Sequence, residues 1–177
     1  MLSSPEETTP TDPESGHVTP ADEQEYREFV AARMNPLRRT AYLLCRDWHS
    51  ADDLVSITIG KLYRRWRRVR AAENVDAYVR GVLVHAWLDE RRRPWRREAA
   101  TAELPETAGA ASDQVEDRLL LLDLLAQLPP RRRAVVVLRF YCDLSVAETA
   151  AILDINEGTV KSQAARGLAT LRLLARS

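Results

Sequence analysis

Apolar side chains recur along the chain at the three- and four-residue spacing of helices, and nothing resembles a pair of strands. The pattern predicts two helical blocks, residues 23–97 and 115–177, separated by a stretch of Ala, Thr, Glu, Pro and Gly at 98–114. Residues 1–22 are rich in Pro, Ser, Thr, Glu and Asp, and such a segment cannot bury enough apolar surface to become ordered. We therefore expect an all-α protein. Two small helical domains follow a disordered acidic tail and are joined by a flexible acidic linker.

Capping residues divide the first block into helices. The first helix is expected to begin near Asp22 and to bend near Pro36, because proline restricts the residue before it. Ser50 is the candidate cap of a second helix, and Asn74 is the candidate cap of a third. The apolar spacing over residues 86–97 predicts either a fourth helix or a continuation of the third.

The second block begins with a leucine-rich helix over residues 115–128. The two prolines at 129–130 end this helix and begin the next, which is expected over 131–141. Ser145 then caps a short helix, and Glu148 lies three residues later, where it closes a capping box. The block therefore contains at least three helices in close succession.

A tight turn at residues 154–158 leads into the last predicted helix, 157–174. Two helices joined by such a turn form an ordinary helical hairpin or a DNA-binding helix-turn-helix. The first turns of the last helix are polar, with donors where a recognition helix meets base edges and phosphates, and this favours DNA binding. The outward positions include Thr159, Lys161, Ser162, Gln163 and Arg166.

Charge is segregated along the chain, although the formal net charge is zero. Residues 61–97 carry twelve basic and four acidic side chains, and residues 131–177 carry eight basic and four acidic. The first of these segments also interleaves arginines with aromatic residues, a combination suited to single-stranded nucleic acid. The alternative is that Trp66 and Tyr78 belong to the core and that the arginines form a solvated face.

The ordered set of motifs resembles a bacterial extracytoplasmic-function sigma factor of the actinobacterial type. The resemblance covers about residues 24–174. It depends on Ala51-Asp-Asp-Leu-Val55, Ala77-Tyr-Val-Arg-Gly-Val-Leu-Val84, the arginine and aromatic block, the acidic linker, Leu128-Pro-Pro-Arg-Arg-Arg-Ala-Val-Val-Val-Leu-Arg-Phe-Tyr141 and Gly158-Thr-Val-Lys-Ser-Gln163. The resemblance implies a sigma region 2-like helical bundle at 23–97 and a sigma region 4-like helix-turn-helix domain at 115–177.

In this family the first domain docks on the β′ clamp helices of RNA polymerase and opens the minus-10 promoter element. The family usually continues its docking motif with Gln and an acidic residue, whereas this chain has Ser56 and Ile57. Docking is therefore expected either to be weaker or to depend more on Asp52, Asp53 and Arg65. The full polymerase-binding set that the resemblance implies is Asp52, Asp53, Leu54, Ser56, Ile57 and Arg65.

The resemblance also implies two groups of DNA-binding residues. A loop after Val84 is expected to capture a flipped base of the minus-10 strand, with His85 where the family commonly has Asn. The minus-10 set is Arg80, His85, Trp87, Arg91, Arg92 and Arg93. Residue Ala165 is small, so its expected contact with the minus-35 duplex is limited to an apolar one, such as a thymine methyl group. The minus-35 set is Thr159, Lys161, Ser162, Ala165 and Arg166.

The implied partners are core RNA polymerase, through its β′ clamp helices and β flap, promoter DNA, and an anti-sigma factor as a further candidate. We expect a cytoplasmic protein without cofactor, metal, membrane insertion or catalysis. A stand-alone helix-turn-helix regulator is the main alternative. An enzyme that acts on nucleic acid is the second alternative, with the acidic pairs Asp52/Asp53 and Asp89/Glu90 as candidate metal ligands.

Overall fold

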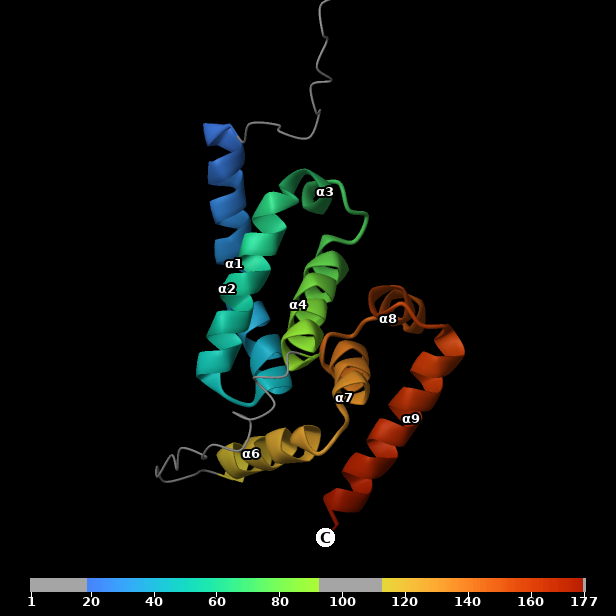
Figure 1. Cartoon of the computed structure of the whole chain (residues 1–177). Coiled ribbons are helices and arrows are strands. Elements are labelled where there is room, and N and C mark those ends of the chain that lie inside the picture. Colours follow the sequence, from blue (N-terminus) through green and yellow to red (C-terminus); the bar gives the residue numbers. More distant parts are fainter. Residues whose placement is uncertain (1–18, 93–112, 177) are drawn as a thin grey trace, which may run out of the picture.

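The computed structural model describes residues 19–92 and 113–176, and every regular element within these ranges is helical, as predicted (Figure 1). Outside these ranges lie most of the predicted linker and all but the last four residues of the predicted acidic tail. The elements are α1 (Pro20–Cys45), α2 (Trp48–Arg64), α3 (Trp66–Arg70), α4 (Val75–Arg92), α6 (Asp113–Ala126), α7 (Pro130–Val136), the π-helical turn η1 (Val137–Tyr141), α8 (Val146–Leu153) and α9 (Glu157–Leu174). We refer to α1–α4 as the N-lobe and to α6–α9 as the C-lobe.

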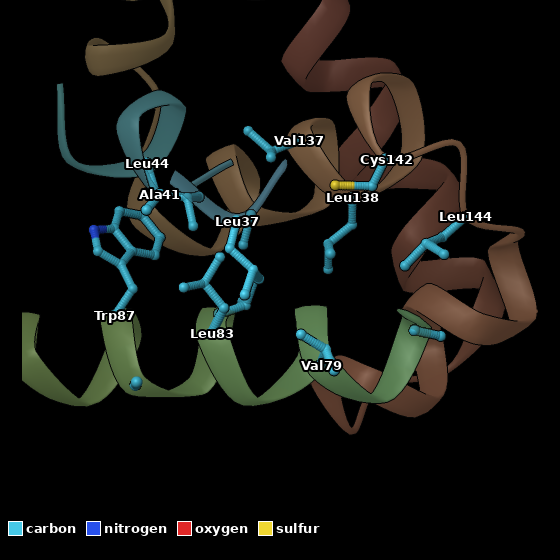
Figure 2. Packing of buried hydrophobic residues seen from close by; sticks show 14 of the residues in the cluster. Leu37, Ala41, Leu44, Val79, Leu83, Trp87, Val137, Leu138, Cys142 and Leu144 are labelled. Carbon is cyan, nitrogen blue, oxygen red and sulfur yellow. The ribbon is translucent and has the colours of Figure 1, made fainter. Parts of the chain in front are cut away.

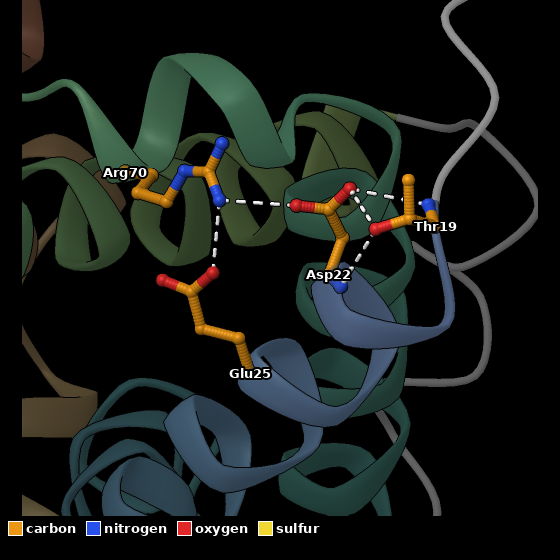
Figure 3. Close-up of polar contacts among 4 residues, drawn as sticks. All are labelled: Thr19, Asp22, Glu25 and Arg70. Carbon is orange, nitrogen blue, oxygen red and sulfur yellow. Dashed lines mark hydrogen bonds and ion pairs between the residues drawn. The ribbon is translucent and has the colours of Figure 1, made fainter.

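Helix α1 begins at Pro20, earlier than the predicted boundary after residue 22, because a capping box holds its first turn. The Thr19 hydroxyl oxygen accepts from the Asp22 backbone N–H at 3.2 Å, and the Asp22 carboxylate accepts from the Thr19 N–H at 3.1 Å. Figure 3 shows that the guanidinium of Arg70, at the end of α3, also contacts Asp22 at 3.0 Å and Glu25 at 2.9 Å. The start of α1 is thereby tied to α3.

Local capping chemistry also determines where α2, α4 and α8 begin. Helix α2 begins at Trp48 because the Asp47 carboxylate accepts from the Ser50 backbone N–H at 2.7 Å, so the predicted Ser50 cap is wrong. The predicted cap at Asn74 is confirmed, since its side chain accepts from the Ala77 N–H at 3.0 Å. The capping box at the start of α8 is confirmed too.

Helix α4 is continuous through Arg92, and the segment from residue 86 continues it, which was one of the two predicted alternatives. The predicted loop after Val84 is therefore wrong, because apolar residues at helical spacing extend across that point and are buried. In the C-lobe the helix predicted over 131–141 is divided. Its second half widens into the π-helical turn η1, where the Cys142 N–H donates to the carbonyl of Val137, five residues earlier, at 3.0 Å.

The two lobes pack against one another through one hydrophobic cluster (Figure 2). Helices α1 and α4 supply the N-lobe side, and α7, η1 and the segment before α8 supply the C-lobe side. The labelled members in Figure 2 are Leu37, Ala41, Leu44, Val79, Leu83, Trp87, Val137, Leu138, Cys142 and Leu144, and none is more than 9% exposed. Residues that belong to different predicted domains thus share a core.

Arg133 of α7 is the one charged side chain among the described residues that is classed as buried, with 5% exposure. Its guanidinium donates to the Leu44 carbonyl and to the Ala126 carbonyl, each at 2.7 Å. These carbonyls lie at the ends of α1 and α6, where a cation is favoured by the helix dipole. Burial lowers the pKa of Arg133 to about 10, so it remains a cation at neutral pH and links the two lobes.

Candidate nucleic-acid interface

The beginning of α9 is held by its own cap and by its buried side. The Asn156 side chain accepts from the Thr159 backbone N–H at 2.7 Å, and Val160 and Ala164 are buried beneath the helix. Asp154, which adopts the left-handed conformation with φ of 51°, ends α8 just before this cap. The turn between α8 and α9 is thus defined by two short polar residues, which tolerate such backbone geometry.

The structure brings most of the predicted minus-35 residues together on the outer face of α9. Lys161, Ser162, Ala165 and Arg166 are all exposed. Ser162, Ala165 and Arg166 follow Lys161 by one, four and five residues, and this spacing places all four on one side of the helix. Thr159 is half-buried, and its hydroxyl donates to the Asn156 side chain at 3.0 Å. This face presents two cations and a hydroxyl group without obstruction by the N-lobe, a surface that suits the major groove.

The predicted minus-10 residues are more dispersed. Arg91 and Arg92 are exposed at the end of α4, Arg80 is half-buried about three turns earlier, and Arg93 lies outside the described residues. His85 points toward α8, where its Nε2 lies 2.6 Å from the Ile152 carbonyl oxygen. Since a carbonyl only accepts, the imidazole donates this hydrogen bond from Nε2.

Two predicted contact residues are buried, and for these the prediction is wrong in this arrangement. Trp87 is 3% exposed and belongs to the core that the two lobes share, and the Arg133 guanidinium of the C-lobe lies 5.5 Å from the centre of its ring. Leu54 is also 3% exposed and belongs to the core beneath α2. Leu54 therefore supports the predicted docking helix from inside. Trp66, for which a core position was the alternative, is buried at 5% exposure.

The other predicted polymerase-binding residues lie along α2. Asp52, Asp53 and Ser56 are exposed near its beginning, whereas Ile57 is half-buried. Arg65 is exposed beyond the far end of the helix. Both Asp52 oxygens accept hydrogen bonds from Arg38, at 2.5 and 2.9 Å. Hydrogen bonding to this guanidinium lowers the pKa of Asp52, so the carboxylate is charged and already occupied.

A cavity of about 240 Å³ lies at the seam between α4 and the C-lobe. His85 and Arg92 line it from α4, and Arg131, Thr159 and Gln163 line it from the C-lobe. The two predicted groups of DNA-reading residues thus approach each other at this seam. Arg131 is not among the DNA-binding residues predicted from the sequence. Three consecutive arginines on a helix cannot all face the core, so the Arg131–Arg133 run indicates that one of them faces outward.

The two acidic pairs named as candidate metal ligands lie on different helices, Asp52 and Asp53 on α2 and Asp89 and Glu90 on α4. Among residues 19–92 and 113–176, no three His, Cys, Asp or Glu side chains gather as metal ligands. In the same part of the chain, no helix has both the length and the apolar character that a membrane crossing requires.

The comparisons with known proteins agree with this arrangement of two regions. Residues 29–97 match the Sigma-70 region 2 family, and residues 118–171 match the Sigma-70, region 4 family. The chain is 39% identical over 149 residues to the RNA polymerase sigma-E factor of Streptomyces coelicolor, covering 84% of each protein. It is 30% identical over 160 residues to the ECF RNA polymerase sigma factor SigM of Mycobacterium tuberculosis, covering 90% of this chain and 81% of that one.

Solved structures share the fold. The sigma factor RpoE in complex with the anti-sigma factor NepR from Bartonella quintana matches with a TM-score of 0.69 and 21% identity, over 86% of this chain and 98% of that one. CnrH in complex with the cytosolic domain of CnrY matches with a TM-score of 0.60 and 20% identity, over 87% of this chain and 89% of that one.

A helical bundle followed by a helix-turn-helix lobe, with each part matching its own sigma-70 region, defines the class as a two-region sigma factor. The chain belongs to the extracytoplasmic-function sigma factors of the sigma-70 family. It is an alternative sigma factor that directs transcription, and the predicted family is confirmed.

Proposed function

We propose that this sigma factor binds core RNA polymerase and reads its promoter at two places, the minus-35 duplex with α9 and the melted minus-10 strand with residues of α4. The exposed face of α9 is the observation that carries the proposal. Lys161 and Arg166 provide phosphate or base contacts, Ser162 adds a hydroxyl group, and Ala165 leaves room for a thymine methyl group. The Asn156 cap and the buried side of α9 hold this face in place.

The minus-10 contact requires a change of arrangement. His85 hydrogen-bonds to the Ile152 carbonyl, so it reads a base only after the C-lobe moves away from α4. Arg91 and Arg92, which are exposed already, supply phosphate contacts together with Arg80 and Arg93. We infer that engagement with polymerase separates the lobes and frees His85. The same movement would withdraw Arg133 from the ring of Trp87, which is buried in the closed arrangement.

The proposed partners follow from the same surfaces. The exposed residues of α2 would dock on the β′ clamp helices, and the C-lobe would dock on the β flap. Because RpoE was solved in complex with the anti-sigma factor NepR, an anti-sigma factor is proposed here as well. A protein that works with RNA polymerase on promoter DNA acts in the cytoplasm.

A stand-alone DNA-binding regulator is the second candidate function, and one observation favours it. The outer face of α9 is open even while the lobes are packed together, so duplex DNA could bind it without polymerase. Affinity for duplex DNA in the absence of polymerase distinguishes the two functions. The sigma factor should bind weakly alone, because its two DNA contacts gain strength only when they are joined on one template.

The test of minus-35 reading is promoter selection from a randomised library with core RNA polymerase. Arg166→Ala should lower transcription and relax the preference at one or two minus-35 positions, since a lost base contact costs about 1–3 kcal/mol. Arg172→Ala is the matched control, because Arg172 is also exposed on α9 but lies in its last turn. Equal effects of the two substitutions, or an unchanged minus-35 preference for Arg166→Ala, would refute this assignment.

A further inference from the structure

The beginning of α2 carries a stacked pair of aromatic rings at the protein surface. The ring of Trp48 lies on the ring of Tyr42 from α1, with centroids 4.0 Å apart and planes inclined by 10°. Even so, Trp48 remains 42% exposed. An indole that is exposed to water and held in one orientation offers a large contact area at little cost in conformational entropy.

An ion pair supports the same indole. The Arg38 guanidinium lies 5.3 Å from the centre of the Trp48 ring. Arg38 in turn donates two hydrogen bonds to Asp52, and these occupy both carboxylate oxygens. The side chains therefore form one connected cluster, which consists of Tyr42, Trp48, Arg38 and Asp52. Within it, the ion pair fixes the guanidinium, and the guanidinium helps to fix the indole ring.

This cluster continues the face of α2 that we propose as the polymerase-docking surface. Trp48, Asp52 and Ser56 are spaced by four residues, so they follow one stripe of the helix, and Asp53 is adjacent to it. The stripe is exposed along these positions. Ser56 and Ile57 replace the amide and carboxylate that are usual in the family, so the stripe is short of polar anchors where docking is expected.

We propose that Trp48 is the apolar anchor by which this chain docks on core RNA polymerase, and that Arg38 and Asp52 act as positioning residues for it. The inference rests on the proposed function. Trp, Tyr and Arg are the residue types that dominate interface energetics, and a preorganised Trp loses little freedom on binding. The contact surface on the polymerase would offer aliphatic side chains to the indole and a cation to Asp53.

The composition of the patch favours this occupant over a second copy of the chain. A single exposed indole, bordered by Arg38, His49 and Asp52, is not a continuous apolar face of the kind that buries itself in a stable dimer. Its place at one end of the proposed docking stripe fits one strong contact within a larger interface. The identity of the partner therefore follows from continuity with α2.

The first test is a titration of the labelled full-length protein with core RNA polymerase. Trp48→Ala should weaken binding roughly 10- to 30-fold, as expected of a preorganised aromatic anchor, whereas Trp48→Phe should retain most of the affinity. Glu28→Ala is the control, because Glu28 is exposed on α1 and lies outside the proposed docking stripe. Thermal unfolding of each variant confirms that it is folded.

A double-mutant cycle tests the positioning role of Asp52. Asp52→Ala should weaken binding in the wild-type background. It should cause no further loss when Trp48 is already Ala, because both substitutions act on the same contact, that of the indole with the polymerase. Equal losses in the two backgrounds would show that Asp52 meets the polymerase directly and would overturn this role. Unchanged binding of Trp48→Ala would overturn the anchor, while transcription by the wild-type protein would leave the proposed function intact. Failure of the wild-type protein to bind core polymerase would refute the proposed function instead.

Discussion

Two buried glycines in helices should respond to alanine in opposite directions. Gly167 lies in the middle of α9, where it packs against α7, and a Cβ added there would lie 2.6 Å from the Cγ2 of Val136. Real Cβ contacts are not this short, and the β-branched Val136 is itself buried. Gly81 lies in the middle of α4, and its added Cβ would lie 3.4 Å from Ile152, which is an ordinary contact.

The expected magnitudes follow from these distances. Alanine in place of glycine gains about 1 kcal/mol in a helix interior, but overpacking a well-packed contact costs about 1–3 kcal/mol. Gly167→Ala should therefore lower the free energy of unfolding by up to about 2 kcal/mol, because α7 and α9 must separate. Gly81→Ala has no such penalty and should raise this free energy by up to about 1 kcal/mol.

Thermal and urea unfolding of the two variants beside the wild type measure these changes. A shift of 1 kcal/mol corresponds to roughly 2–4 °C in Tm for a chain of this size. Stabilisation by Gly167→Ala, or equal destabilisation by both substitutions, would show that α7 and α9 are not packed as described. The pair is informative because both changes add the same methyl group to a buried helical position.

Two further predictions concern the lobe contact and a helix cap. Arg133→Met should lower the free energy of unfolding by about 1–3 kcal/mol, because it leaves the Leu44 and Ala126 carbonyls without their donor. This loss is partly offset, since the substitution also removes a buried cation. Urea unfolding measures the change, and an unchanged free energy would contradict the role of Arg133. Hydrogen bonds from the backbone and side chain of Ser145 lower the pKa of Glu148 below its ordinary value of 4.5. The cap therefore contributes stability above the unfolded pKa and loses it as the pH falls through the lower folded pKa. Glu148→Gln should accordingly flatten the acid limb of the stability curve, and an unchanged limb would contradict the reasoning.

Local chemistry explains which features could be predicted from sequence. The capping box at Ser145 and the bounds of the last helix follow from residues a few positions apart, and both agree with the structure. The predicted cap of α2 is wrong because Asp47 and Ser50, three residues apart, are both residue types that cap helices well. Only the backbone geometry decides that Asp47 accepts the hydrogen bond.

Long-range packing explains what could not be predicted. Trp87 belongs to the arginine and aromatic block of the sequence, where an aromatic residue suits either a base contact or a core, and packing between distant segments decides for the core. Arg131, Arg132 and Arg133 are identical in type, yet they are exposed, half-buried and buried in turn. The predicted loop after Val84 came from resemblance alone, while the local apolar spacing already continued the helix.

The closed arrangement has a consequence for activity. If the C-lobe moves away from α4 to free His85, the shared core, the hydrogen bond from Arg133 to Leu44 and the contact between His85 and Ile152 are all disrupted. The contacts that polymerase and promoter make with the separated lobes have to offset this cost. A ligand shifts such an equilibrium only through its stronger binding to one of the two states.

In vitro transcription tests the central claim most directly. Core RNA polymerase from an actinobacterium, this protein and a set of upstream genomic fragments are combined, and the start sites of the transcripts are mapped. The account predicts discrete transcripts only when both proteins are present, with two shared sequence elements at fixed distances upstream of the starts. An absence of transcripts, together with binding of the protein to duplex DNA without polymerase, would contradict it.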